Sequence, residues 1–330
     1  MNRLLKVELT RLSWRKLPVV ALLAILAIVV LSLTAVHLQA RTAAPGSEQY
    51  EMMKSEYEAY VADYEENGEQ YRADCLEQQD QEREATGDQT LDFGCDADQI
   101  GTLQDWIGGP GDLQPETGSL LDGLTTVFLL ISLLVGASAT AAEYSHRTMG
   151  TWLTFEPRRT MVYVSKVAAA ALVAAPAAIL GMALAVLGMF AVYQLNGLPT
   201  SLTSAEWQSL LWRGVRLAWL AAVSAAFGAA LGTLLRRTSV VLGLVLIYTV
   251  VGETLISGIL PALTPALLGS NIRAFAQNGW TWFTYPCEGG GACREVEHVL
   301  SLSQASVYLG ALSAVVLVGT WVVFRRRDVE

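Results

Sequence analysis

The stretch LPVVALLAILAIVVLSLTAVHL, residues 17–38, decides the fold class of this chain because it contains no Asp, Glu, Lys or Arg. A helix of roughly 20 apolar residues crosses the hydrocarbon core of a bilayer, and it satisfies its backbone hydrogen bonds internally. We therefore interpret this stretch as a membrane span. The alternative is a cleaved signal peptide, but the run is long for a signal core, and ARTAA at 40–44 is only a weak cleavage signal.

Similar uncharged runs recur along the 330 residues, of which 52% are hydrophobic. They predict an all-α polytopic membrane protein with six transmembrane helices and a kink at Pro176 in the third. The expected segments are an amphipathic interfacial helix (1–16), the first span (17–39), an extracytoplasmic acidic domain (40–118), the second span (119–142), a cytoplasmic coupling segment (143–160), the third span (161–193), an outer loop (194–208), the fourth span (209–235), the fifth span (239–260), an outer or re-entrant region with short half-helices (261–303), the sixth span (304–324) and a cytoplasmic tail (325–330).

Two unrelated kinds of residue predict the same sidedness. Of the 22 Lys and Arg residues, 14 fall in the short segments on the side of the N-terminus, which predicts that both termini lie in the cytoplasm. We expect the chain to lie in the plasma membrane. All four cysteines fall on the other side, where disulfides persist. Two local bridges, Cys75–Cys95 and Cys287–Cys293, fit best among the three possible pairings. A metal site is the competing interpretation, although no histidines cluster near these cysteines.

The acidic balance, a net charge of −9, comes mostly from residues 48–116. No basic face is formed, so we expect no nucleic-acid partner. Within this region aromatic side chains recur at helical spacing, which predicts the packing face of a helical, disulfide-stabilised outer domain. The alternative is a surface for cargo or a partner, with the acids attracting cations. The recurring positions are Tyr50, Met53, Tyr57, Tyr60, Tyr64 and Tyr71.

Motifs for catalysis are missing from the sequence. There is no GxxxxGK[ST], HExxH, GxSxG or CxxC motif, and the three histidines are scattered. We expect no catalytic residue, metal or cofactor on this chain. Glu253 interrupts the fifth span, where a carboxylate is costly. It is either a cargo or gating contact or a hydrogen-bonded structural residue helped by Thr249, Thr254 or Ser257.

The segment EYSHRTMGTWLTFEPRRTMVYVSK, residues 143–166, predicts a short amphipathic helix between the second and third spans. From the residues alone it is either a loop with interfacial anchors or a docking element for another protein. The segment resembles the one that follows the second span in ABC-2 type transporter permeases, although Arg147 stands where glycine is usual there. The matching residues are Glu143, Tyr144, Thr148, Leu153, Thr154, Pro157, Arg159 and Lys166.

The ends ELTRLSWRK and FRRRDVE also resemble this family, and the six-span layout covers nearly the whole chain. The resemblance implies a permease subunit that pairs with a second copy or a paralogue and exports a hydrophobic or amphipathic molecule, such as a drug, antibiotic, peptide or lipid. It implies that a separate ATP-binding cassette subunit binds ATP and Mg and hydrolyses the ATP. Membrane lipid is the remaining partner. The alternative function is a membrane signalling or assembly protein whose outer domain senses or binds a partner. The expected coupling residues are Glu143, Tyr144, Thr148, Trp152, Leu153, Phe155, Arg158 and Arg159.

Overall fold

The computed structural model describes residues 2–87, 89, 91–95, 100–285 and 295–327. Six helices in these ranges are long and apolar enough to cross a membrane, so the chain has the architecture of a multi-pass helical membrane protein. The number of these helices agrees with the predicted number of spans. The six helices are α2 (Lys16–Thr42), α5 (Leu113–Ser145), α7 (Arg159–Leu195), α8 (Ser204–Leu235), the continuous helix Thr238–Ile259, which contains α9 (Thr238–Ile247), η1 (Tyr248–Ile256) and α10 (Ser257–Ile259), and α12 (Leu302–Arg326).

Two of the spans begin earlier than their apolar residues suggested. Helix α8 begins at Ser204, because Thr203 and Glu206 form a capping box in the polar segment before it. Helix α5 begins at Leu113, and Pro115 is tolerated in its first turn. Pro176 lies inside α7, which is assigned as one helix from Arg159 to Leu195. Hydropathy predicts only the apolar part of each helix, so it does not predict where a helix extends into a polar segment.

Helices α5 and α8 form the centre of the bundle. In their most apolar windows 50% and 56% of residues are buried, against 11% in the fifth span. The two backbones meet without intervening side chains: a Cβ at Gly228 would lie 1.9 Å from the carbonyl oxygen of Leu133, and one at Gly136 would lie 1.9 Å from that of Ala225. Thr140 donates a hydrogen bond across the contact to Ala229 O (2.9 Å). Small residues therefore set the helix separation, as is typical of helix pairs in lipid.

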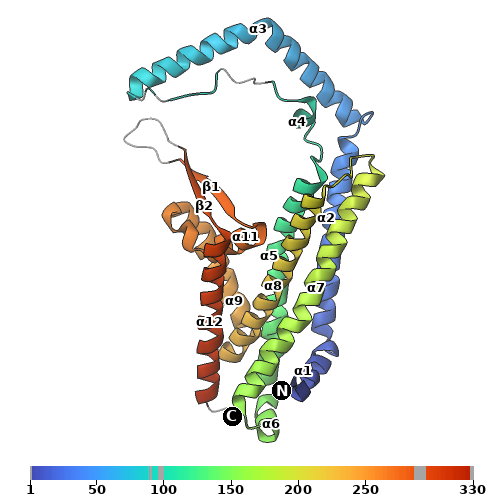
Figure 1. Cartoon of the computed structure of the whole chain (residues 1–330), viewed down its shortest axis with the longest axis vertical. Helices are drawn as coiled ribbons and strands as arrows, with labels where there is room; N and C mark the ends of the chain where they lie inside the picture. Colours follow the sequence, from blue (N-terminus) through green and yellow to red (C-terminus); the bar gives the residue numbers. More distant parts are fainter. Residues whose placement is uncertain (1, 88, 90, 96–99, 286–294, 328–330) are drawn as a thin grey trace.

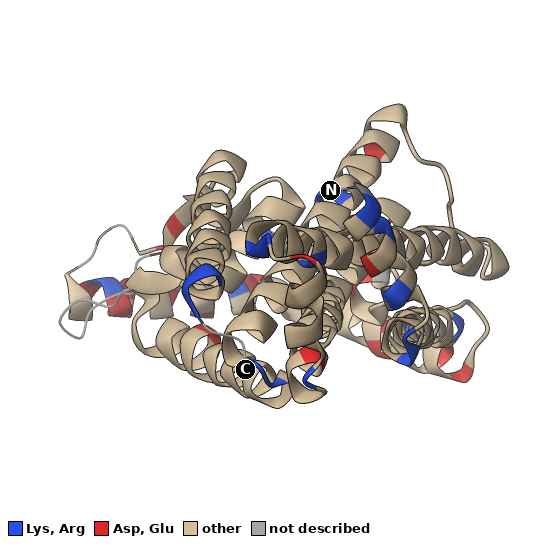
Figure 2. Cartoon of the chain, turned by 90° about the horizontal axis from the view of Figure 1, so that it is seen from below, with Lys and Arg blue, Asp and Glu red and all other residues tan. Residues whose placement is uncertain are grey.

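Both chain ends lie at one end of the bundle (Figure 1). Helix α1 (Asn2–Ser13) and helix α6 (Thr148–Phe155) lie at the same end. Seen from that side, Lys and Arg residues lie close to both termini (Figure 2). The amphipathic α1 is confirmed, but it packs on the bundle as well: Leu12 is buried against Ala139 of α5 and Ala169 of α7.

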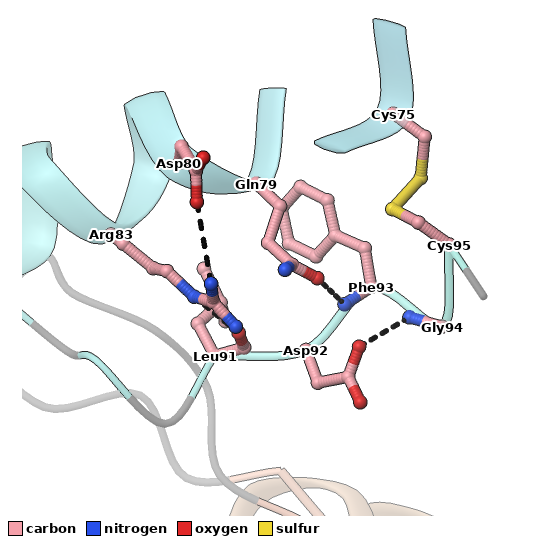
Figure 3. Close-up of a disulfide and its surroundings, with 9 residues drawn as sticks. All are labelled: Cys75, Gln79, Asp80, Arg83, Leu91, Asp92, Phe93, Gly94 and Cys95. Carbon is pink, nitrogen blue, oxygen red and sulfur yellow. Dashed lines mark hydrogen bonds and ion pairs between the residues drawn. A yellow bond between two sulfur atoms is a disulfide. The ribbon is translucent and has the colours of Figure 1, made fainter. Parts of the chain in front are cut away.

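The opposite end carries the acidic domain that was predicted to lie outside, built on the 39-residue helix α3 (Glu48–Thr86) and the short helix α4 (Leu103–Ile107). Part of the predicted tyrosine face packs as expected, since Tyr60 stacks on Trp106 of α4 with ring centroids 5.1 Å apart. The Cys75–Cys95 disulfide is confirmed (Figure 3). Beside it, Gln79 accepts a hydrogen bond from Phe93 N (2.6 Å), which ties the returning chain to α3. Cys287 and Cys293 lie outside the described residues.

The region before the last span departs from the all-α expectation. After the 3-10 turn η2 (Pro261–Ala266) and the helix α11 (Leu268–Gln277), strands β1 (Trp280–Thr284) and β2 (Val296–Leu300) form an antiparallel hairpin in which Trp282 pairs with His298. Side chains of both strands alternate between more and less buried positions. Short half-helices were predicted between Pro261 and Trp282, but aromatic and β-branched residues from Trp280 onward favour a strand there. Helix α11 is the short α-helix that forms within the predicted range.

Candidate functional site

Helix α6 is a separate eight-residue element between α5 and α7. The chain turns into it at Arg147, whose φ of 56° lies in the left-handed region that glycine adopts at least cost. Met149 is fully buried with Val162 and Tyr163 of α7 and Phe324 of α12. A movement of α6 therefore reaches two spans through direct packing.

Beneath α6 lies a group of five charged side chains, which we call the charge cluster: Glu8, Arg11, Arg15, Glu143 and Lys166. Lys166 Nζ lies 2.8 Å from Glu8 Oε1 and 2.6 Å from Glu143 Oε2. Arg11 and Arg15 approach Glu143 Oε1 at 3.3 and 3.5 Å. The cluster joins α1, α5 and α7 at one point.

The cluster is largely withdrawn from water. Glu8, Glu143 and Lys166 are only 5%, 2% and 5% exposed. The Lys166–Glu143 contact lacks hydrogen-bond geometry at Oε2, so it acts as a charge contact. Buried charges are tolerated only when they are paired, which makes each member depend on the others.

Trp152 of α6 covers the cluster. Arg11 lies 5.0 Å and Lys166 5.4 Å from the centre of its rings, both within cation–π range. Trp152 is thus half-buried. The sequence had led us to expect that it would be exposed to solvent. Leu153 is also half-buried, against the core around Met149. Of the three apolar coupling residues on α6, Trp152, Leu153 and Phe155, only Phe155 is open, with 83% of its surface exposed.

The other expected coupling residues have partners within the chain. The ring of Tyr144 lies 5.2 Å from the guanidinium of Arg236, and Thr148 donates a hydrogen bond to the carbonyl of Glu143 (3.3 Å). Arg158 donates to Glu156 (2.7 Å) and thereby lowers the pKa of that carboxyl below its ordinary value. Arg159 donates to the carbonyl oxygens of Arg325 and Arg327, at the end of α12.

Glu8, Arg11 and Arg15 were missed as site residues because they were assigned to a helix lying on the membrane surface. A signal was present, since Glu8 is the one acid in a basic helix and shares a helical face with Leu5 and Leu12. An acid on an apolar face predicts a buried cation as its partner. Lys166, already part of the quoted segment, is that cation.

Glu253 lies in the π-helical turn η1 and is bound to α11. Its Oε1 accepts hydrogen bonds from Gly269 N and Tyr248 Oη, both at 2.7 Å. The same Tyr248 oxygen accepts from Leu268 N at 2.9 Å. The two side chains thus cap the first amides of α11, which favour a negative charge. Glu253 is therefore a hydrogen-bonded structural residue, and Tyr248 is the side chain that bonds its carboxylate. A cargo or gating role for Glu253 stays a prediction.

Replacing Glu253 by alanine should loosen α11 specifically. Losing a cap costs about 1–2 kcal/mol, so we expect the first amides of α11 to exchange hydrogen about 5–30-fold faster. Hydrogen exchange read by mass spectrometry measures this. Glu297→Ala, an exposed acid on β2, is the control and should leave α11 unchanged. Unaltered α11 exchange in Glu253→Ala would show that the cap does not hold the helix.

Within the described ranges, no three His, Cys, Asp or Glu residues converge as metal ligands do. Comparison of the chain with protein-family models, curated proteins and solved structures gives no match in any of the three.

Proposed function

We propose that this chain is the transmembrane permease subunit of an ABC-2 type ATP-driven exporter. In this proposal both termini and α6 lie in the cytoplasm, and a separate ATP-binding cassette subunit, which holds ATP and Mg, docks on α6. A second copy of the chain or a paralogue completes the transporter in the plasma membrane. The cargo is a hydrophobic or amphipathic molecule.

The observation that carries the proposal is the contrast between the buried and the exposed apolar side chains of α6. Met149 and Trp152 hold the helix against the bundle, with Trp152 over the charge cluster. Phe155, the last residue of the helix, is exposed to solvent at the end of the molecule that carries both termini. An exposed aromatic side chain on a short helix is the kind of anchor that fills a pocket on a partner protein.

The buried side chains of α6 give a route for force. A push on α6 acts on α7 and α12 through Met149 and on α1 through Trp152 and Arg11. Because α1 also packs on α5 and α7, the elements at this end would tend to move together. Closure of two ATP-binding subunits would thus be converted into a rearrangement of the spans.

Sidedness has independent support. Lys and Arg residues surround the end with the termini, and the Cys75–Cys95 disulfide lies at the other end. Basic residues favour the cytoplasmic side, whereas disulfides persist outside it.

Phe155→Glu should release the ATP-binding subunit without unfolding the permease, because the side chain is exposed. The test is affinity purification of the tagged chain from its native membranes, with quantitative mass spectrometry of co-isolated ATP-binding cassette proteins. We expect a stoichiometric ATP-binding subunit with the unchanged chain and at least about a tenfold loss with the variant, as for an interface hot spot. Phe93→Glu, an exposed phenylalanine of the outer domain, is the matched control. Failure to recover any such subunit with the unchanged chain would favour a signalling or assembly role.

A further inference from the structure

The fourth span carries an arginine whose charge has no acidic partner. Arg216 of α8 donates one hydrogen bond from Nη1 to Asn278 Oδ1 (2.9 Å), while its buried Nε has no hydrogen-bond partner. Among the described residues no carboxylate lies within ion-pair distance of it. The nearby Asp122 is already occupied by Arg213 (3.2 Å) and Gln277 (2.7 Å). The C-terminal end of α11 offers only a partial negative charge.

The length of α8 places Arg216 at a definite depth. The span ends at Leu235, directly before Arg236 and Arg237, which mark one membrane boundary. Counting back from Arg236 the roughly 20 residues that cross the hydrocarbon core reaches Arg216. The same count along α5, from Glu143, reaches Asp122 and Gly123. Arg216 therefore lies at the level of the lipid head groups in the leaflet away from the termini.

Two tryptophans flank Arg216 on the same face of α8. Trp212 lies one turn nearer the outer end of the helix and Trp219 one turn deeper, at i−4 and i+3. They are 56% and 43% exposed. Trp219 also contacts Phe275 of α11, with ring centroids 5.0 Å apart. Amphipathic indole rings are typical of the membrane interface, where they contact glycerol and the first methylenes of lipids.

We infer that Arg216, flanked by Trp212 and Trp219, binds the phosphate of a lipid in the leaflet opposite the chain termini. The guanidinium supplies the charge and the donors that phosphate requires, and the indoles contact the acyl chains. Asn278 holds the guanidinium at the edge of α11. The inference rests on the membrane architecture and is independent of transport, so its outcome does not depend on an ATP-binding partner.

The test is native mass spectrometry of the delipidated, detergent-solubilised chain titrated with dioleoyl phosphatidylglycerol. We expect Arg216→Gln to weaken binding of the tightest lipid about tenfold, as for loss of a charge-assisted hydrogen bond. Arg273→Gln removes the same charge from the exposed face of α11 and should bind normally. Dioleoylglycerol, which lacks phosphate, should not occupy the site. Equal affinity in Arg216→Gln, or an equal loss in Arg273→Gln, would overturn the inference.

A soluble competitor distinguishes a lipid from free phosphate. Glycerol phosphate at millimolar concentration should not displace the lipid, because it lacks acyl chains for the two indoles; displacement would overturn the lipid assignment. Should Arg216→Gln fail to fold, fluorescence of the otherwise unchanged chain in vesicles gives a second test. Dibrominated phosphatidylglycerol should quench more than dibrominated phosphatidylcholine, and Trp212→Phe/Trp219→Phe should abolish the excess. Equal quenching by the two lipids in the unchanged chain would contradict the site.

Discussion

Replacing Glu143 by glutamine should lower the free energy of unfolding by about 3–5 kcal/mol, the range for breaking a buried ion pair by removing one partner. Glu143 is 2% exposed and is the acid nearest to Arg11, Arg15 and Lys166. Without it, three cations share Glu8 in a site that water scarcely reaches. Thermal or SDS-induced unfolding of the purified chain in detergent measures the loss.

Two further variants make this result specific. Glu156→Gln breaks the surface pair with the exposed Arg158 and should leave the unfolding midpoint unchanged, because solvent screens such pairs. Glu143→Gln/Lys166→Met should recover part of the loss, since removing the cation relieves the unpaired charge. A Glu143→Gln protein as stable as the unchanged chain, or a double variant whose losses simply add, would contradict a cooperative cluster.

Substitution of Gly228 by leucine should prevent the bundle from assembling. Even the first carbon of the new side chain would lie 1.9 Å from the carbonyl oxygen of Leu133, and backbone cannot rotate away as a side chain can. Helices α5 and α8 would have to separate along the centre of the bundle, at a cost above the roughly 1–3 kcal/mol typical of overpacking. The yield of monodisperse protein on size-exclusion chromatography measures the effect, and we expect little or none.

Gly319→Leu is the matched control, because the space around Gly319 in α12 is open. That variant should be recovered in normal yield. Recovery of folded Gly228→Leu would show that α5 and α8 are not in backbone contact.

The membrane spans could be predicted because lipid requires a long apolar helix, and such a helix can be recognised from a short stretch of sequence. The first residues of α5 and α8 could not be predicted in this way, because they lie in polar segments before the apolar runs. The hairpin β1–β2 was missed because its residues lie between two membrane-length helices, where an outer or re-entrant region without strands was predicted. The α5–α8 contact had a signal in the GxxxG spacing of Gly228 and Gly232.

The candidate site, α6 with the charge cluster, could be predicted only in part from the sequence. Local pattern predicted the helix at α6, and the sequence singled out Trp152 and Phe155 on it, together with Glu143 near the end of α5. What covers each side chain could not be predicted, because the covering groups come from α1, α7 and α12. Glu8 and Lys166 lie 158 positions apart in the chain and meet only through tertiary packing. For the same reason Trp152 was expected to face a partner and instead covers two cations.

The central claim is that α6 docks an ATP-binding subunit through Phe155, and photocrosslinking at that position tests it most directly. A benzophenone amino acid would replace Phe155 in the chain expressed in its native host, and Phe93 in a control. Irradiation should join the chain to an ATP-binding cassette protein from position 155 and not from position 93. An adduct from position 155 that contains only lipid, or no adduct in a chain that reaches the membrane normally, would contradict the claim.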